Sequence, residues 1–386
     1  MLEKTKKLFR EVFLEEGKSF YFSPGRVNLI GEYTDIAGGH VFPAAIQLGV
    51  FAVVSKRLDK KVCFFSGNIE EAGVIETDLD NMVYDKSHGW CNYLKGMFFE
   101  LSKENFTYPH GLNICINGNL PNGAGLSSSA CIEVLMGKII LEEYKYDLDN
   151  VSLVEHAVAC ENSFVGVNCG MMDQFAVCMG IKDKAIVLNT KTLEYKYGSF
   201  PLDEIDLVIM NTNKRRGLQD SKYNERRSEV EEAVRDLKTV LDFEDLCDLS
   251  VLEFEENKKV IKNHLARKRA KHCISENERV LKALEVLNVE KNIEKFGVLL
   301  NESHQSLKHD FEVTGNELDT IVSLAKDAGA IGSRMTGAGF GGCALMICKK
   351  NDTKRISQVV IEEYTKKIGY APTLFNVSLE DGTRRL

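Results

Sequence analysis

A strand-like run, a glycine-rich turn and a helical pattern follow one another between residues 112 and 144, and this succession constrains the fold more than any other feature. The turn reads LPNGAGLSSSA at residues 120–130, after a strand expected at 112–116 and before a helix expected from about 127 to 144. Glycines let a backbone approach a ligand closely, and the free N–H groups at a helix start attract an anion. A helix cap explains one serine but not three beside two glycines. The segment therefore predicts a phosphate-binding loop, with hydroxyls from Ser127, Ser128 and Ser129.

A second glycine-rich segment, TGAGFGG at residues 336–342, contains the spacing G-x-G-x-x-G. A strand-like run follows it and not a helix, so the context of a dinucleotide-binding fingerprint is missing. We expect this segment either to pack near the first loop or to serve only as a turn into a strand. Residues 17–19 resemble the end of a Walker A loop, but Val12 stands where that motif requires a glycine.

Carboxylates stand in two further segments. SPGRVNLIGEYTDIAGG at residues 23–39 places Arg26, Glu32 and Asp35 among glycines. Ionised carboxylates can orient a sugar through several hydrogen bonds, although turn and capping roles would explain these residues equally well. In CGMMDQF, residues 169–175, Asp173 stands between apolar neighbours. If Asp173 is buried it needs a cation, for which Arg26 is available, and the alternative is an exposed loop aspartate.

The remaining pattern predicts an α+β protein of two closely joined domains. Strand-like runs at residues 49–55, 61–65, 185–188, 207–210 and 374–377 accompany helical patterns, and the composition changes between residues 190 and 205. Charged helical stretches occupy residues 224 to about 286. We interpret the charge run at residues 253–271 as a solvated helical face.

Charge and hydropathy exclude several classes of protein. The 49 Lys and Arg residues against 57 Asp and Glu give a net charge of −8, which disfavours binding to nucleic acid or to an anionic membrane. The uncharged stretches at residues 36–55 and 105–132 are too rich in polar residues and glycine to span a bilayer. There is no signal-peptide pattern at the N-terminus, and the eleven cysteines lack C-x-x-C spacing. We expect a cytoplasmic protein with reduced cysteines.

Five segments, in this order and at this spacing, resemble those of the galactokinase family within the GHMP small-molecule kinases: GRVNLIGEYTD, LPNGAGLSSSA, CGMMDQF, NTN at residues 211–213, and MTGAGFGGC. The resemblance covers nearly the whole chain, and five motifs in register are far more specific than one glycine loop. It implies a two-domain α+β GHMP kinase fold. Residues 1–195 would form a domain like the second domain of ribosomal protein S5, and residues 196–386 a ferredoxin-like domain.

The resemblance also implies transfer of the γ-phosphoryl group of ATP to the anomeric hydroxyl of galactose, with Mg²⁺. Asp173 matches the catalytic base, and Arg26 matches its companion. Ser129 and Glu161 match the positions associated with Mg²⁺, and Trp90 matches the adenine side, although it could be a core aromatic instead. The residues expected to contact the sugar are Glu32, Tyr33, Asp35, Gly170 and Tyr223. Those expected beneath the nucleotide are Gly123, Ala124, Gly125, Leu126, Ser127, Ser128 and Ser129.

The sequence departs from the family pattern at residues 32–38, which read EYTDIAG where the family usually has EHTDYNG. A phenol in place of an imidazole at Tyr33 changes the size of the side chain and removes a possible cation, so a different sugar such as N-acetylgalactosamine is an alternative. Another alternative is a sugar and ATP sensor without transferase activity. The complete serine loop, with Asp173 and Arg26, favours an enzyme. We expect a monomer.

Overall fold

The computed structural model describes residues 1–121, 125–167, 169–214 and 219–386. Its largest sheet has six strands in the order β13-β1-β3-β6-β4-β5, in which only the β4–β6 pair is parallel. These strands are β1 Ser19–Asn28, β3 Pro43–Lys56, β4 Lys61–Ser66, β5 Ile75–Asp78, β6 Leu112–Gly118 and β13 Arg384–Arg385.

Two smaller sheets complete the strand pairing of the described residues. A four-stranded antiparallel sheet has the order β10-β11-β9-β12, and a three-stranded one has the order β2-β7-β8. Their strands are β2 His40–Val41, β7 Lys184–Asn189, β8 Tyr195–Ser199, β9 Ile205–Asn211, β10 Gly332–Thr336, β11 Cys343–Lys349 and β12 Thr373–Val377. The strands that the sequence predicts at residues 49–55, 61–65, 112–116, 185–188, 207–210 and 374–377 are confirmed.

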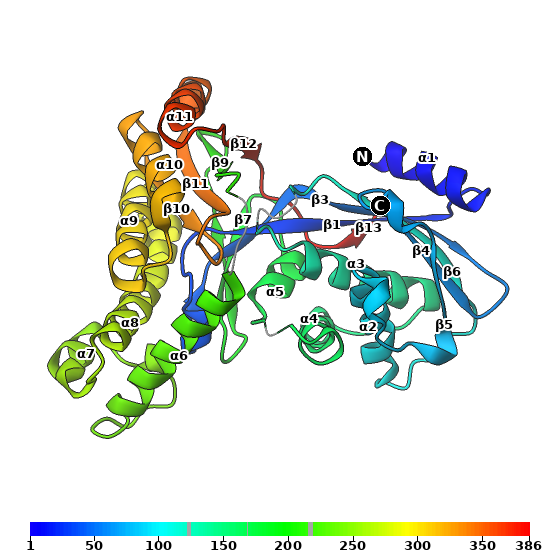
Figure 1. Ribbon diagram of the computed structural model, residues 1–386, viewed down its shortest axis with the longest axis horizontal. Coiled ribbons are helices and arrows are strands. Elements are labelled where there is room, and N and C mark those ends of the chain that lie inside the picture. Colours follow the sequence, from blue (N-terminus) through cyan, green and yellow to red (C-terminus); the bar gives the residue numbers. More distant parts are fainter. Residues whose placement is uncertain (122–124, 168, 215–218) are drawn as a thin grey trace.

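Helices cover the sheets. They are α1 Leu2–Phe13, α2 Cys91–Ser102, α3 Ser128–Tyr144, α4 Asn150–Ala159, α5 Met172–Met179, α6 Gln219–Leu237, α7 Val251–Asn257, α8 His264–Glu285, α9 Ile293–Ser306, α10 Gly315–Asp327 and α11 Thr353–Ile368. The helices α2 to α5 lie together on one side of the six-stranded sheet, and α9 to α11 lie beside the four-stranded sheet (Figure 1). The helix expected after the phosphate loop is confirmed as α3.

The core beneath the six-stranded sheet explains why α3 is apolar on nearly every side. Val134, Leu135 and Met136 on successive faces of α3 are fully buried, because the sheet covers one side and α2 and α4 cover the others. On the opposite face of the sheet, Phe9 of α1 packs against Val53. The start of α3, and with it the phosphate loop, is therefore held by packing on several sides.

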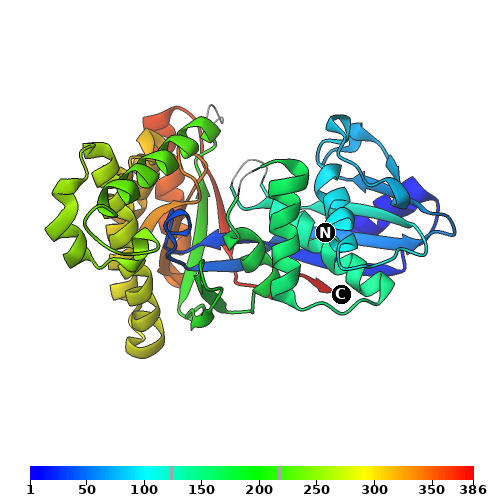
Figure 2. The ribbon, with the colours of Figure 1, turned by 90° about the horizontal axis from the view of Figure 1, so that it is seen from below.

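The segment after β1 leaves the six-stranded sheet and packs against the second half of the chain. Leu29 and Ile30 join a core with β9 and β11, while Tyr33 and Ala37 join the core formed by α6 and α8. Figure 2 shows this blue segment reaching the helices on the left. At the other end of the chain, Arg385 returns to pair with β1. The expected sugar-binding segment thus lies where the two parts of the molecule meet.

One charged residue of the predicted solvated face is buried. Arg269, within the charge run taken as a solvated face, is 1% exposed and pairs with Glu229 at 2.6 Å and with Glu312 at 3.0 Å, so the interpretation is wrong at that residue. The side of α8 that carries Arg269 packs against α6, and this packing requires an ion pair. The predicted division between residues 195 and 196 falls within β8, which pairs with β7.

Cys91, Cys115 and Cys131 are free, buried thiols. Within the described residues, no helix is both long enough and apolar enough to cross a bilayer.

Candidate active site

An ion pair between Arg26 and Asp173 stands at the centre of the site. Arg26 Nε and Nη2 donate to Asp173 Oδ1 and Oδ2 at 2.8 and 2.9 Å, which is a two-point interaction between side chains 147 residues apart. Arg26 lies in β1 and is 6% exposed, whereas Asp173 lies in the first turn of α5 and keeps part of its surface open. The sequence inference that Arg26 is the partner of Asp173 is confirmed, and the carboxylate faces accessible space.

The phosphate loop runs directly beside this pair. Gly125 accepts a hydrogen bond at its carbonyl from Arg26 Nη1 at 2.6 Å, and the hydroxyl of Ser127 donates to Asp173 Oδ2. Gly125 and Ser127 have φ of 73° and 60°, so the loop turns sharply before α3 begins. Leu126 and Ser127 are buried, Ser128 is exposed and Ser129 is half-buried. Gly123 and Ala124 lie outside the described residues.

The second glycine-rich loop packs near the first, which was one of the two sequence expectations for it. A Cβ atom placed on Gly337 would lie 3.7 Å from the carbonyl oxygen of Gly125. Both loops therefore border the same space beside Arg26 and Asp173. The positive φ of Gly337, 82°, suits glycine and explains the residue type at the point of approach.

Asp35 and Gly170 are brought together on the other side of Asp173. A Cβ atom placed on Gly170 would lie 2.9 Å from Asp35 Oδ2, so a larger residue at position 170 would displace the carboxylate. Burial and the nearby charge of Asp173 raise the pKa of Asp35 to about 6. A proton acceptor and a carboxylate with a raised pKa therefore share this part of the site.

Tyr223, in the second turn of α6, lies near the same two carboxylates. Burial raises the pKa of its phenol, and the charges of Asp35 and Asp173 raise it further. The ring of Tyr223 is half-buried and 5.6 Å from the ring of Tyr33. Three of the residues predicted to contact the sugar, Asp35, Gly170 and Tyr223, thus surround Asp173 from separate elements.

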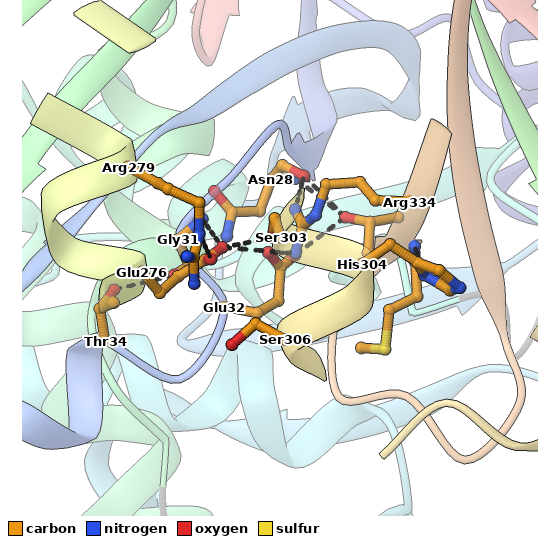
Figure 3. A network of polar contacts seen from close by, with 12 residues as sticks. Asn28, Gly31, Glu32, Thr34, Glu276, Arg279, Ser303, His304, Ser306 and Arg334 are labelled. Atoms are coloured by element: carbon orange, nitrogen blue, oxygen red, sulfur yellow. Dashed lines mark hydrogen bonds and ion pairs between the residues drawn. The ribbon is translucent and has the colours of Figure 1, made fainter. Parts of the chain in front are cut away.

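Glu32 belongs to an interior network of polar side chains, shown in Figure 3. It pairs with the fully buried Arg334 of β10, and its Oε1 accepts hydrogen bonds from the hydroxyl of Thr336 at 3.2 Å and the amide of Gly337 at 3.0 Å. Burial raises the pKa of the Glu32 carboxyl, while Arg334 acts in the opposite direction. Through Thr336 and Gly337, Glu32 holds the beginning of the glycine loop. Its contact with a sugar stays a prediction.

Glu276 of α8 completes this network. Its Oε1 accepts a hydrogen bond from the amide of Gly31 at 3.0 Å, and its Oε2 accepts one from Arg279 Nε at 2.7 Å. Burial alone would raise the pKa of Glu276, but Arg279, His272 and Arg334 together lower it to about 2. The network therefore joins the start of the sugar segment to α8.

Ser129 and Glu161 are joined by a side-chain hydrogen bond, close to Asp173. Glu161 stands in a π-helical turn, Cys160–Val165, that ends α4, and its carboxylate accepts a hydrogen bond from Gln174 Nε2 at 2.7 Å. Burial raises the pKa of the Glu161 carboxyl, and hydrogen bonds from Cys169 and Ser129 oppose this rise. Among the described residues no group of three or more His, Cys, Asp or Glu side chains could hold a metal ion. A hydroxyl and one carboxylate do fit Mg²⁺, which usually takes its remaining ligands from water and a nucleotide.

Sequence reasoning missed Glu133, a fully buried carboxyl group on α3 one turn beyond Ser129. Gln174 Nε2 donates to Glu133 Oε2 at 3.1 Å as well as to Glu161. Burial and the nearness of Glu161 raise the pKa of Glu133. A single acid within the apolar run ACIEVLMGKII, four residues after Ser129, was the available signal.

Trp90 precedes α2 and packs partly against the core beneath the six-stranded sheet. Its indole Nε1 is buried and has no hydrogen-bond partner within the described part of the chain. Both expectations for Trp90, a core aromatic and an adenine-side residue, are compatible with this half-buried position.

Three family models match the chain. The galactokinase galactose-binding signature matches residues 7–56, the N-terminal domain of GHMP kinases matches residues 92–181, and the C-terminal GHMP kinase model matches residues 280–366. A galactokinase of Clostridium beijerinckii is 49% identical over 98% of this chain and 97% of its own length. A galactokinase of Ligilactobacillus salivarius is 50% identical over 98% of each chain.

Solved structures agree with these matches. The crystal structure of Lactococcus lactis galactokinase complexed with galactose has a TM-score of 0.95 and 42% identity, and the match covers both chains completely. A mevalonate kinase structure, at 18% identity and a TM-score of 0.70, covers 94% of this chain and 100% of its own and shares the fold. The expected two-domain GHMP kinase fold is confirmed.

Proposed function

Because this chain belongs to the galactokinase family of GHMP kinases, we propose that it transfers the γ-phosphoryl group of ATP to the anomeric hydroxyl of galactose. The observation that carries this proposal is the Arg26–Asp173 pair, which lies between the phosphate loop and the Asp35–Gly170 side of the site. A proton acceptor is thereby placed between a loop suited to phosphate and carboxylates suited to hydroxyl groups.

In this proposal Asp173 is the catalytic base. Its Oδ2 accepts hydrogen bonds from both Arg26 and Ser127, whereas Oδ1 accepts one from Arg26. A carboxylate oxygen has two lone pairs, so Oδ1 keeps the capacity to take the proton of the sugar hydroxyl. Phosphoryl transfer proceeds through a loose transition state, and most of its catalysis comes from positioning and from neutralising charge. Arg26 supplies positioning, because it orients the Asp173 carboxylate. It also supplies positive charge, because it borders the phosphate loop.

The sugar is assigned to the residues around Asp173. Asp35 accepts hydrogen bonds from sugar hydroxyls, Gly170 leaves room beside it, and Tyr223 closes the opposite side. Glu32 and Tyr33, which the sequence also assigned to the sugar, remain candidates.

ATP is assigned to the phosphate loop and the amino end of α3, where unpaired amides favour phosphate oxygens. Residues 125–129 lie there, and Gly123 and Ala124, outside the described residues, complete the predicted set. Ser129 and Glu161 would hold Mg²⁺, which supplies charge neutralisation at the β- and γ-phosphates. Trp90 is assigned to the adenine side. A cytoplasmic monomer without a membrane or nucleic-acid partner stays our expectation.

The proposal is tested by measuring ATP consumption across hexoses and amino sugars. We expect galactose to be the preferred acceptor, with galactose 1-phosphate as the product. Preference for N-acetylgalactosamine would reassign the substrate, and tight binding of galactose and ATP without turnover would favour the sensor alternative.

A further inference from the structure

Two consecutive residues of the sugar segment hold two consecutive residues of the glycine loop. Glu32 Oε1 accepts a hydrogen bond from the amide of Gly337 at 3.0 Å. Tyr33 Oη donates to the carbonyl oxygen of Ala338 at 2.6 Å. Both side chains are buried, at 3% and 5% exposure, so both contacts lie in the interior of the protein.

The glycine loop depends on anchors of this kind because its backbone forms no regular pairing. Gly337, Gly339, Phe340, Gly341 and Gly342 all have positive φ, between 56° and 129°. The loop's far end is fixed by the amide of Phe340, which donates to Val313 O at 2.7 Å, and by the carbonyl of Gly342, which accepts from Thr212 N at 2.9 Å. Glu32 and Tyr33 fix its near end.

The near end is the part that approaches the phosphate loop. A Cβ atom on Gly337 would lie 3.7 Å from Gly125 O, and the same oxygen accepts the hydrogen bond from Arg26 Nη1. A shift of residues 337–338 would therefore change the space beside Gly125, at the edge of the phosphate loop.

The ring of Tyr33 is also fixed in place. It lies 4.4 Å from the ring of Phe311 and 5.6 Å from that of Tyr223, and the residue has φ of 66°, unusual for a side chain of this size. The phenol is thus held so that its hydroxyl reaches Ala338. An imidazole, which is the usual side chain of the family here, has a shorter reach.

We propose that Tyr33 is a positioning residue for the nucleotide, acting by holding Ala338 and so fixing the glycine loop against the phosphate loop. This inference rests on the proposed function, because it requires ATP to lie over the phosphate loop. It assigns to Tyr33 an effect on the nucleotide and not on the choice of sugar.

The test is Tyr33→Phe, which keeps the ring and removes only the hydroxyl. Calorimetric titration of the purified full chain with ADP and Mg²⁺, without sugar, should show binding weakened by about 3- to 10-fold, the range for loss of one buried hydrogen bond. The dissociation constant for galactose, titrated separately, should change by less than about 2-fold. In steady state, KM for ATP should rise while KM for galactose stays nearly constant.

Tyr144→Phe is the matched control, because Tyr144 Oη also donates to a backbone carbonyl, that of His110, at 2.7 Å. Tyr144 ends α3, roughly 25 Å along the helix from the phosphate loop at about 1.5 Å per residue. Its removal should leave ADP affinity unchanged even if the melting temperature falls. Unchanged ADP affinity in Tyr33→Phe would overturn the inference, as would a change confined to galactose. Failure of the wild-type chain to bind ADP or phosphorylate galactose would instead overturn the proposed function.

Discussion

Asp173 and Asp35 are two carboxylates of one site with different surroundings. Asp173 is held by Arg26 and Ser127, whereas Asp35 Oδ1 accepts a hydrogen bond from the amide of Ile36. Burial and the charge of Asp173 give Asp35 a pKa of about 6. Different surroundings suit the two groups to the different roles that we propose for them, Asp173 as the proton acceptor and Asp35 as a sugar ligand.

At the residue scale, Asp173→Asn should lower kcat by at least about 100-fold, because the amide keeps the shape but cannot accept the proton. Binding of ADP should stay nearly unchanged. Coupled-enzyme kinetics and calorimetry measure the two quantities. Asp183→Asn, which makes the same change at an exposed aspartate, is the control and should behave as wild type. Near wild-type turnover in folded Asp173→Asn would remove Asp173 from the role of base.

The raised pKa of Asp35 predicts a pH dependence. As the pH falls through about 6 the carboxylate is protonated and loses acceptor capacity, so kcat/KM for galactose should fall. Asp35→Asn should have a lower kcat/KM that no longer shows this inflection. Rate measurements between pH 5 and 8 test this, and an identical inflection in wild type and variant would assign it to another group.

The same shift predicts an effect on stability. The folded-state pKa of Asp35 lies above the unfolded value of about 3.9, so its contribution to stability is present below pH 4 and is lost as the pH rises through 6. Asp35→Asn should therefore raise the melting temperature relative to wild type more at pH 8 than at pH 4. Thermal unfolding of both proteins at pH 4 and pH 8 shows whether the difference in melting temperature has this sign.

At the element scale, the site depends on how two helices meet. The beginning of α3 brings Ser129, and the π-helical turn after α4 brings Glu161, while Gln174 of α5 ties Glu161 to Glu133. π-helical turns often occur at functional sites, because the extra residue redirects a side chain. Here the turn contains Glu161 itself.

If Ser129 and Glu161 hold Mg²⁺ as proposed, Ser129→Ala and Glu161→Gln should each raise the Mg²⁺ concentration needed for half-maximal activity by several-fold, because the first removes the hydroxyl oxygen and the second replaces an anionic oxygen with a neutral amide. Affinity for galactose should change little. Metal titrations of activity provide the measurement, and Ser102→Ala, which removes an exposed hydroxyl at the end of α2, is the control. If both variants keep the wild-type Mg²⁺ dependence, the ligands lie elsewhere.

At the scale of the whole molecule, buried charges join the two parts of the chain. Arg334 of β10 is fully buried between Glu32 and Glu276, and its Nη1 donates to the carbonyl of Leu29 at 3.0 Å. The strand β10 belongs to the four-stranded sheet, whereas residues 29–32 continue from the six-stranded one. The division of the chain after residue 195 stays a prediction.

Arg334→Met should lower the free energy of unfolding by about 3–5 kcal/mol, because it leaves the buried carboxylate of Glu32 without its cation. Denaturant unfolding measures the loss. In the Arg334→Met background, Glu32→Gln should lower the free energy of unfolding by less than it does in the wild-type background. A double-mutant cycle measures this difference. Arg355→Met, which breaks an exposed pair with Asp352, is the control and should cost at most about 1 kcal/mol. Additive effects of Arg334→Met and Glu32→Gln would show that the two side chains do not stabilise one another.

The sequence alone predicts those features that depend on neighbouring residues. The strand, loop and helix at residues 112–144, the other strand-like runs and the motifs that place the chain in its family are all local patterns. It also indicated the Arg26–Asp173 pair, because a carboxylate among apolar residues needs a cation and few were available in the motifs.

Which groups face one another across the fold depends on how distant elements pack, and the sequence does not predict it. Arg269 was expected to face solvent, since a charge run does not reveal that α6 covers it. Arg334 and Glu133 gave no strong signal, because their partners come from distant elements. The contact between Tyr33 and Ala338, 305 residues apart, forms only when the two sheets bring the sugar segment and the glycine loop together. Local propensity acts over a few residues, whereas the pairing of buried polar groups is settled by packing over the whole chain.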